Sequence, residues 1–284
     1  MKIIFIFLLQ GIQLKYLKHV NLFGCESITE LPEFCTPSLE ELNLCHCENL
    51  AKVHKSLGLL EKLQIWDLTS CRKLQILPNP LMLISLKYLS LRNCESITEL
   101  PEFYAPSLEE LDLCYCHNLV NVHESVGNLD KLQIWNLQGC GKLQILPNNL
   151  RLKSLEEFLL IDCLRLEKFP NIHPKMKCLR SLDLSWSGIR ELPSSIKYLT
   201  RLELLDLCYC KNLRYLPNDI YKLQLIDKLS IPTAKFRQSY DYLDSFSSYG
   251  FLMLDTVSFR GNKNIIELDF LMKPEYFPIL KSLC

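Results

Sequence analysis

The chain has 284 residues, a formal net charge of zero and a sequence pI of about 7.0. Such a length suits one or two globular domains. A neutral chain has no general electrostatic attraction to nucleic acid or to an anionic membrane, and its basic residues show no clustering on one predicted face. We therefore expect neither a nucleic acid nor a membrane as a partner.

The first 13 residues hold a lysine followed by the apolar run 3–9. The run is too short to span a bilayer, and no small-residue cleavage site comes after it. We interpret residues 1–13 as an apolar N-terminal edge or cap that covers the first repeat of the chain. A short secretory signal, or an artefact of where the chain was started, stays open as an alternative.

Residues 14–231 repeat the spacing LxxLxLxxCxxLxxLP, whose clearest copy is LKYLSLRNCESITELP at 86–101. The first leucines of nine copies are 22 to 24 residues apart. They are Leu17, Leu39, Leu63, Leu86, Leu108, Leu132, Leu155, Leu179 and Leu202. Self-similarity at this period is typical of a leucine-rich-repeat solenoid.

One repeat cannot cover its own apolar face, so neighbouring repeats must bury it. The LxL core alternates apolar and polar residues, as a strand does. We predict an α/β fold, a curved horseshoe with a parallel sheet on its concave face. Segments 56–63 and 194–202 are expected to form short helices or 3₁₀ turns on the convex side. We call the leucines and cysteines at the repeated positions of the LxxLxLxxCxxLxxLP spacing frame residues. Trp66 and Trp135 replace frame leucines and are expected in the core.

Residues 232–253 break the period and are expected to form an irregular insertion, either a contact element or a decayed repeat. Residues 254–284 continue as further, truncated repeats. Blocks 25–86 and 94–155 match at an offset of 69 residues, with 44 of 62 positions identical. The frame leucines, cysteines and prolines survive, and most differences fall on predicted surface.

Fourteen cysteines would suit a disulfide framework, but eight of them share one place in the repeat, the turn after the strand. They are Cys25, Cys47, Cys71, Cys94, Cys116, Cys140, Cys163 and Cys210. A small buried group with a weak donor suits that turn. The chain also has no N-x-[ST] sequon, and a long exterior without a glycosylation site favours a reducing, intracellular environment. We expect free structural thiols. In the CxC pairs the first cysteine should face outward and the second inward, which disfavours a zinc site.

Binding residues should come from outward positions on and just after the strands. One polar row reads Asn21, Asn43, Asp67, Ser90, Asp112, Asn136, Leu159, Asp183, Asp206, Ser230 and Ser258. Its aspartates predict a mildly negative stripe, and exposed aromatic residues are favoured anchors at interfaces. We predict a protein-binding patch made of Asp183, Trp186, Asp206 and Tyr209, with Arg92, Asp112 and Tyr115 further along. The alternative is a solvated face without a specific partner there.

The sequence contains no complete catalytic or cofactor-binding motif among those we looked for. Gly139-x-Gly141 lacks the third glycine of a dinucleotide fingerprint, His123-Glu124 has no second histidine, and no G-x-x-x-x-G-K-[ST] loop exists. An open solenoid face also lacks the water-excluding pocket that catalysis usually needs. We therefore expect no enzyme, no cofactor and no metal.

Two stretches carry a family resemblance, LEELDLCYCHNLVNVHESVGNLDKLQIWNLQGCGKLQILP and LDLSWSGIRELPSSIKYLTRLELLDLCYCKNLRYLP. With NIIELDFLMKPEYFP, they resemble the repeat domain of plant TIR–NBS–LRR disease-resistance proteins, and the resemblance covers roughly residues 11–284. It implies the repeat portion of a cytoplasmic or nucleocytoplasmic immune receptor. Such repeats take part in sensing pathogen effectors and in holding the receptor inactive, so the expected partner is an effector or a sibling receptor domain. The signalling segments of that family are absent from this sequence. A general intracellular scaffold for a host complex is the alternative function.

Overall fold

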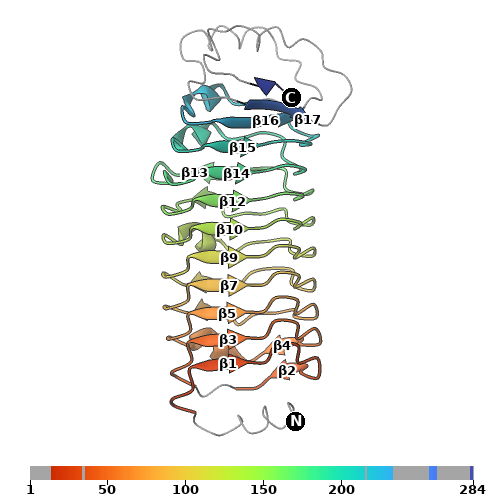
Figure 1. Ribbon diagram of the computed structural model, residues 1–284, viewed down its shortest axis with the longest axis vertical. Helices are drawn as coiled ribbons and strands as arrows, with labels where there is room; N and C mark the ends of the chain where they lie inside the picture. Colours follow the sequence, from red (N-terminus) through yellow and green to blue (C-terminus); the bar gives the residue numbers. More distant parts are fainter. Residues whose placement is uncertain (1–13, 34–35, 215, 233–255, 261–281, 284) are drawn as a thin grey trace.

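The repeats stack into one long parallel sheet, whose strands succeed one another along the long axis of the molecule (Figure 1). The computed structural model describes residues 14–33, 36–214, 216–232, 256–260 and 282–283. Twelve strands within these ranges form the sheet, in chain order. They are β1 (His19–Asn21), β3 (Glu41–Asn43), β5 (Ile65–Asp67), β7 (Tyr88–Ser90), β9 (Glu110–Asp112), β10 (Ile134–Asn136), β12 (Glu157–Leu159), β14 (Ser181–Asp183), β15 (Leu204–Asp206), β16 (Lys228–Pro232), β17 (Thr256–Arg260) and β18 (Ser282–Leu283). The predicted leucine-rich-repeat solenoid is confirmed.

The middle residue of each short strand faces the core, because side chains alternate along a strand. Leu111 of β9 lies between Leu89 of β7 and Trp135 of β10 in register, and all three are fully buried. Trp66 is also fully buried, so the prediction that both tryptophans replace frame leucines in the core is confirmed. The Trp135 ring stacks on that of Phe158, with centroids 4.7 Å apart. Each fully buried side chain of this size contributes about 1.5–3 kcal/mol of transfer free energy.

The opposite side of the solenoid carries short elements, and we call it the helix side. The two predicted segments are confirmed as the 3₁₀ helices η1 (Lys55–Leu59) and η3 (Ser194–Tyr198). Two more 3₁₀ helices, η2 (Glu124–Asn128) and η4 (Asn218–Lys222), lie in other repeats. Three pairs of two-residue strands complete the turns: β2 (Glu30–Leu31) with β4 (Lys52–Val53), β6 (Leu81–Met82) with β8 (Phe103–Tyr104), and β11 (Asn149–Leu150) with β13 (Asn171–Ile172).

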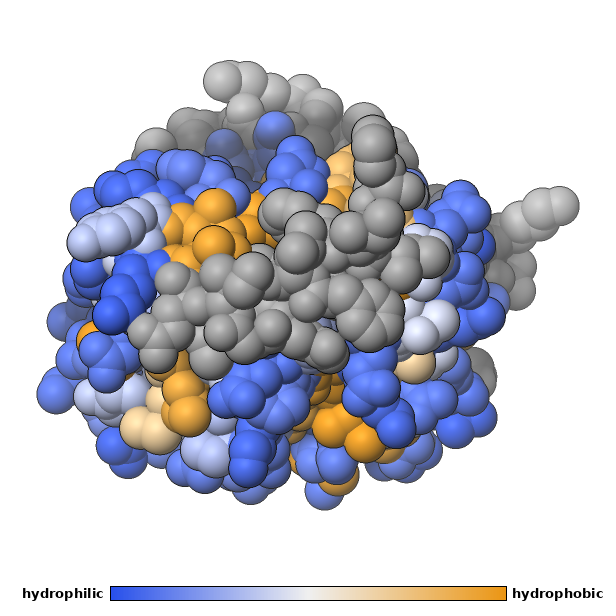
Figure 2. Space-filling model, turned by 90° about the horizontal axis from the view of Figure 1, so that it is seen from below, coloured by the Kyte–Doolittle hydropathy of each residue, from blue (hydrophilic) through white to orange (hydrophobic). Residues whose placement is uncertain are grey.

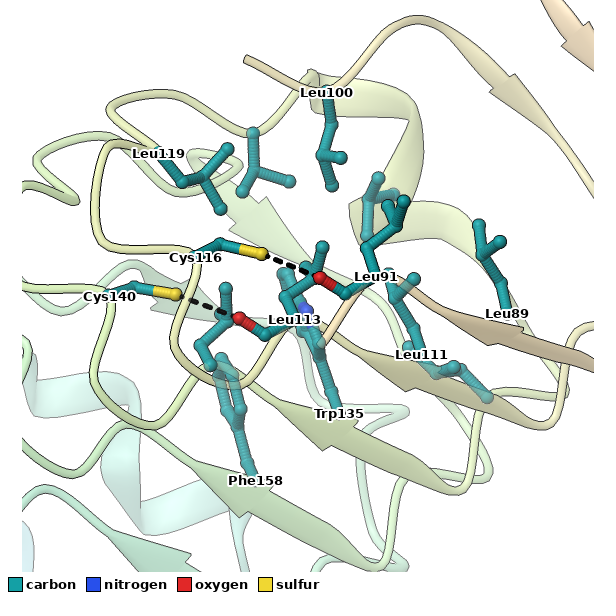
Figure 3. Close-up of a cluster of buried hydrophobic side chains, with 14 of the residues drawn as sticks. Leu89, Leu91, Leu100, Leu111, Leu113, Cys116, Leu119, Trp135, Cys140 and Phe158 are labelled. Atoms are coloured by element: carbon teal, nitrogen blue, oxygen red, sulfur yellow. Dashed lines mark hydrogen bonds between the residues drawn. The ribbon is translucent and has the colours of Figure 1, made fainter. Parts of the chain in front are cut away.

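The repeated cysteine links each turn to the one before it. The Cys116 thiol donates to the Leu91 carbonyl at 3.1 Å, and the Cys140 thiol donates to the Leu113 carbonyl at 3.2 Å (Figure 3). Five further frame cysteines make the equivalent bond, at 2.9 to 3.3 Å. The expected role as a buried weak donor is confirmed, and the twelve cysteines in the described part of the chain are free. Burial raises the pKa of the Cys116 thiol to about 12.

The first cysteines of the CxC pairs are less exposed than we expected. Cys45 is half-buried, and Cys114 and Cys208 are buried, so an outward-facing position does not leave these side chains exposed to solvent. Both nevertheless lie outside the hydrophobic core that holds Cys116 and Cys210. The two members of each pair therefore do lie on different sides of the backbone, and neighbouring side chains cover the first one.

Three of the predicted segments fall largely outside the described residues. These are the apolar edge at 1–13, the insertion at 232–253 apart from Pro232, and most of the truncated repeats at 254–284. Within the last segment, β17 pairs in register with β16, and β18 pairs in register with β17. The segment boundaries stay predictions.

Seen from its N-terminal end, the molecule has a rim of mainly polar residues, with apolar residues gathered nearer the middle (Figure 2). That distribution agrees with a core that runs the length of the stack. No helix in the described ranges is long and apolar enough to cross a membrane.

Candidate protein-recognition surface

The polar row on the sheet is engaged in the turns that come after the strands. At seven positions the side-chain oxygen of the row residue accepts a bond from the backbone N–H two residues later, at 2.8 to 3.0 Å. These residues are Asn21, Asn43, Asp67, Asp112, Asn136, Asp183 and Asp206. Asparagine and aspartate favour such local side-chain to backbone bonds in turns. The row therefore has a structural role that we did not predict.

The third residue after each row position has a left-handed backbone in every repeat from β1 to β15. We call these positions the left-handed ladder: Gly24, His46, Ser70, Asn93, Tyr115, Gly139, Asp162, Trp186 and Tyr209, with φ between 58° and 73°. The next repeat holds the ladder backbone in place, as where the N–H of Trp186 donates to the Cys208 carbonyl at 2.8 Å. A positive φ is rare for bulky residues. The fold thus holds three aromatic side chains at places where such residues are seldom found.

Trp186 and Tyr209 form a stacked pair at adjacent steps of the ladder. Their ring centroids are 4.1 Å apart and the rings are 12° from parallel. The Lys211 ammonium lies 5.7 Å from the centroid of the Trp186 ring. Trp186 remains 43% exposed in spite of the stack. The pair forms a stacked aromatic surface beside the sheet, and both rings are at least partly exposed to solvent.

Two aspartates lie beside this pair on the last residues of β14 and β15. Asp183 and Asp206 are partners in the strand register, so their carboxylates occupy neighbouring places on one face. Burial raises the pKa of Asp183, the bonds from Ser185 oppose that rise, and the Asp206 charge adds to it. The four residues Asp183, Trp186, Asp206 and Tyr209 are therefore brought together.

Arg92, Asp112 and Tyr115 form a second cluster. The Arg92 guanidinium lies 3.3 Å from the Asp112 carboxylate and 5.9 Å from the centroid of the Tyr115 ring. The Gln138 amide donates to the Tyr115 hydroxyl at 3.3 Å. Asp112 is only 7% exposed, so its carboxylate serves mainly to hold Arg92 and the turn.

The structure does not merge these two clusters into one patch. Tyr115 and Trp186 are three repeats apart, which corresponds to about 14 Å at the spacing of strands in a sheet. Between them the ladder has Gly139 and the exposed Asp162. That the clusters bind a partner stays a prediction. In the described ranges, no group of three or more His, Cys, Asp or Glu side chains has an arrangement that could hold a metal.

Comparison with known proteins connects this chain with plant defence. The family model for the leucine-rich repeats of disease resistance protein RPS4B-like proteins matches residues 151–284. TMV resistance protein N of Nicotiana glutinosa is 33% identical over 196 residues, which are 66% of this chain and 17% of that protein. Disease resistance protein RPP5 of Arabidopsis thaliana is 30% identical over 240 residues, or 76% of this chain and 16% of that protein. The chain thus spans less than a fifth of the length of these two relatives.

A solved structure supports the fold alone. One chain of the octameric complex of Latrophilin 3, Unc5D and FLRT2 (LRR) superposes with a TM-score of 0.56. The superposition covers 92% of this chain and 83% of that chain, at 18% identity. At that identity the likeness carries no information about partners.

Proposed function

Since this chain is a leucine-rich-repeat portion of the plant TIR–NBS–LRR disease-resistance class, we propose that it is the protein-recognition module of an intracellular immune receptor. Its place of action would be the cytoplasm, with the nucleus as a second compartment. Its partner would be a pathogen effector or a sibling domain of the same receptor. The observation that carries the proposal is the exposed Trp186–Tyr209 stack beside Asp183 and Asp206.

Physical chemistry supports the use of this stack as an anchor. Aromatic residues dominate the energetics of protein interfaces because they bury a large area with few rotatable bonds. Here the stacking and the left-handed backbone fix the rings before any partner arrives, so binding loses little further conformational freedom. The two adjacent carboxylates favour a partner that places a lysine or arginine next to its apolar contact.

The test is the double variant Trp186→Asn, Tyr209→Asn. Asparagine tolerates the left-handed backbone better than a large ring does, and Asn93 already occupies the same ladder position. The relief of two strained backbones offsets the loss of the ring stack, so we expect a melting temperature within a few degrees of the wild-type value. Tyr16→Asn is the matched control, because Tyr16 is a highly exposed aromatic residue near the other end of the chain.

The readout is quantitative capture of proteins from pathogen-infected plant tissue. We expect the wild type and the Tyr16→Asn control to retain a pathogen protein or the receptor's own nucleotide-binding segment, and the double variant to lose it. Equal capture by all three proteins would remove the stack from the binding surface. Capture of housekeeping proteins alone would favour the general scaffold instead.

A further inference from the structure

A hollow on the helix side gathers basic residues from successive turns of the solenoid. It has a volume of about 200 Å³ and is lined by Asn128, Asp130, Arg151, Lys153, His173 and Lys175. Backbone bonds place these turns side by side: the Arg151 N–H donates to the Gly127 carbonyl at 2.8 Å, and the His173 N–H donates to the Leu150 carbonyl at 2.9 Å. We expected no clustering of basic residues on any face, and here that expectation was wrong.

The hollow has a surplus of positive charge. Lys153 pairs with Asp130, whereas neither Arg151 nor Lys175 has a carboxylate partner in the part of the chain that the structure describes. Three cationic side chains and one carboxylate leave a local charge of +2. The Nδ1 atom of His173 accepts a bond from the Lys175 N–H at 3.2 Å. The neutral ring therefore carries its proton on Nε2, which is a further donor.

The internal duplication shows that this charge is particular to one copy. At the offset of 69 residues, Arg151 and Lys153 correspond to Met82 and Ile84, and Asn128 corresponds to Leu59. In the first copy those three side chains are apolar and exposed, and Tyr104 is the register partner of Met82 in the β6–β8 pair. We call Leu59, Met82, Ile84 and Tyr104 the apolar patch. It lies on the helix side, and each of its members is three repeats before its counterpart in the hollow.

We propose that the helix side binds a phosphorylated polypeptide segment, with its phosphate in the hollow and an apolar side chain on the apolar patch. A phosphomonoester carries a charge of about −1.5 to −2 at neutral pH and three acceptor oxygens. The hollow complements this group with a local charge of +2, the guanidinium N–H donors of Arg151 and the imidazole N–H of His173. A carboxylate would match less of this charge and fewer of these donors.

The neighbouring apolar patch favours a polypeptide over a smaller or a longer polyanion. Free phosphate and sugar phosphates have no apolar group for Met82 or Tyr104 to contact. A nucleic acid backbone needs an extended basic stripe, whereas this chain has a net charge of zero. Tyr104 and Arg151 are two repeats apart, about 10 Å, which an extended chain crosses in about three residues. A leucine three residues before a phosphoserine would reach both places.

The experiment is titration calorimetry of the full chain with a short peptide that has leucine three residues before phosphoserine. The test variant is Arg151→Met, Lys153→Ile, which installs the residues of the first copy in the same backbone surroundings. The control variant is Lys62→Ile, Arg201→Met, which removes the same charge from exposed positions outside the hollow. The comparison probes are the unphosphorylated peptide, inorganic phosphate, and the peptide with aspartate in place of phosphoserine.

We expect the wild type and the control variant to bind the phosphopeptide, and the test variant to bind it at least about tenfold more weakly. The unphosphorylated and aspartate peptides should bind at least as weakly as that. No binding by the wild type, or equal affinity of the test variant, would overturn the proposal. If the protein bound inorganic phosphate as tightly as the phosphopeptide, the occupant would not be a polypeptide, and the hollow would instead be a site for a small phosphate-bearing ligand. These results do not depend on the Trp186–Tyr209 stack, which lies on the other surface.

Discussion

The contact between Tyr115 and Gly139 gives a sharp prediction about how the sheet surface was built. Gly139 has φ +73°, and a Cβ atom placed on it would lie 2.4 Å from Cδ1 of the Tyr115 ring. The equivalent residues of the first copy are His46 and Ser70. We predict that Gly139→Ser destabilises the chain when Tyr115 is present, and that Tyr115→His removes part of that effect.

The magnitude can be worked from two separate costs. A serine with a left-handed backbone costs about 1 kcal/mol relative to glycine. Displacing the Tyr115 ring loses its contacts with Arg92 and Gln138, together about 1 kcal/mol at an exposed site. Gly139→Ser should therefore cost about 2 kcal/mol and Tyr115→His about 1 kcal/mol. The double variant should also cost about 2 kcal/mol, because the ring contacts can be lost only once.

The assay is urea unfolding followed by far-UV circular dichroism for the wild type, both single variants and the double variant. A common slope against urea concentration is needed before the free energies are compared. We expect a coupling energy of about 1 kcal/mol between the two sites. Additive effects, with coupling below about 0.3 kcal/mol, would refute the view that the glycine makes room for the ring.

Two further predictions concern titration. Asp183→Asn should raise the free energy of unfolding at pH 7 by about 0.2–1 kcal/mol, since it removes like charge beside Asp206 while asparagine can keep the bond from Ser185. Burial raises the pKa of Asp183, so this gain should vanish once acid protonates the aspartate, and a gain that persists at pH 3 would contradict the argument. Burial also raises the pKa of six frame cysteines, that of Cys116 to about 12, so their stabilising effect is complete below the unfolded-state pKa of about 8.5 and is lost as pH rises towards 12. The other five are Cys71, Cys94, Cys140, Cys163 and Cys210. The free energy of unfolding should fall between about pH 8 and pH 10.5 by up to about 1.4 kcal/mol per pH unit for each thiol, and a constant urea midpoint would count against buried neutral thiols.

The repeat spacing was enough to predict the stack of strands, because the position of each leucine decides which face is buried. The same reasoning placed Trp66 and Trp135 inside and the frame cysteines on the turns. The repeat spacing did not show that the polar row also accepts hydrogen bonds in the turns, since the position of an aspartate in a strand pattern does not tell which backbone N–H donates to its carboxylate. It therefore did not show that Asp112 is buried and accepts a bond in its own turn; that Asp112 takes part in binding stays a prediction.

The left-handed ladder was missed although the sequence held a signal for it. Glycine, asparagine, aspartate and histidine are the residues that most readily adopt a positive φ. Gly24, His46, Asn93, Gly139 and Asp162 all stand directly before the frame cysteine. That composition predicts a left-handed turn. It also makes Tyr115, Trp186 and Tyr209 exceptions that need an explanation beyond backbone preference.

The duplicated blocks indicate where this chain has changed without altering its frame. Differences fall on the turns of the sheet surface, as at His46 and Tyr115, and on the helix side, as at Met82 and Arg151. Exposed positions tolerate change, so a single difference argues for nothing. The pair Tyr115 and Gly139 is different, because the Tyr115 ring occupies the space that a Cβ atom at position 139 would take, and the two differences are therefore coupled. A coupling energy between positions 115 and 139 would therefore show that these two differences do not act independently, whereas drift at separate sites would leave their effects additive.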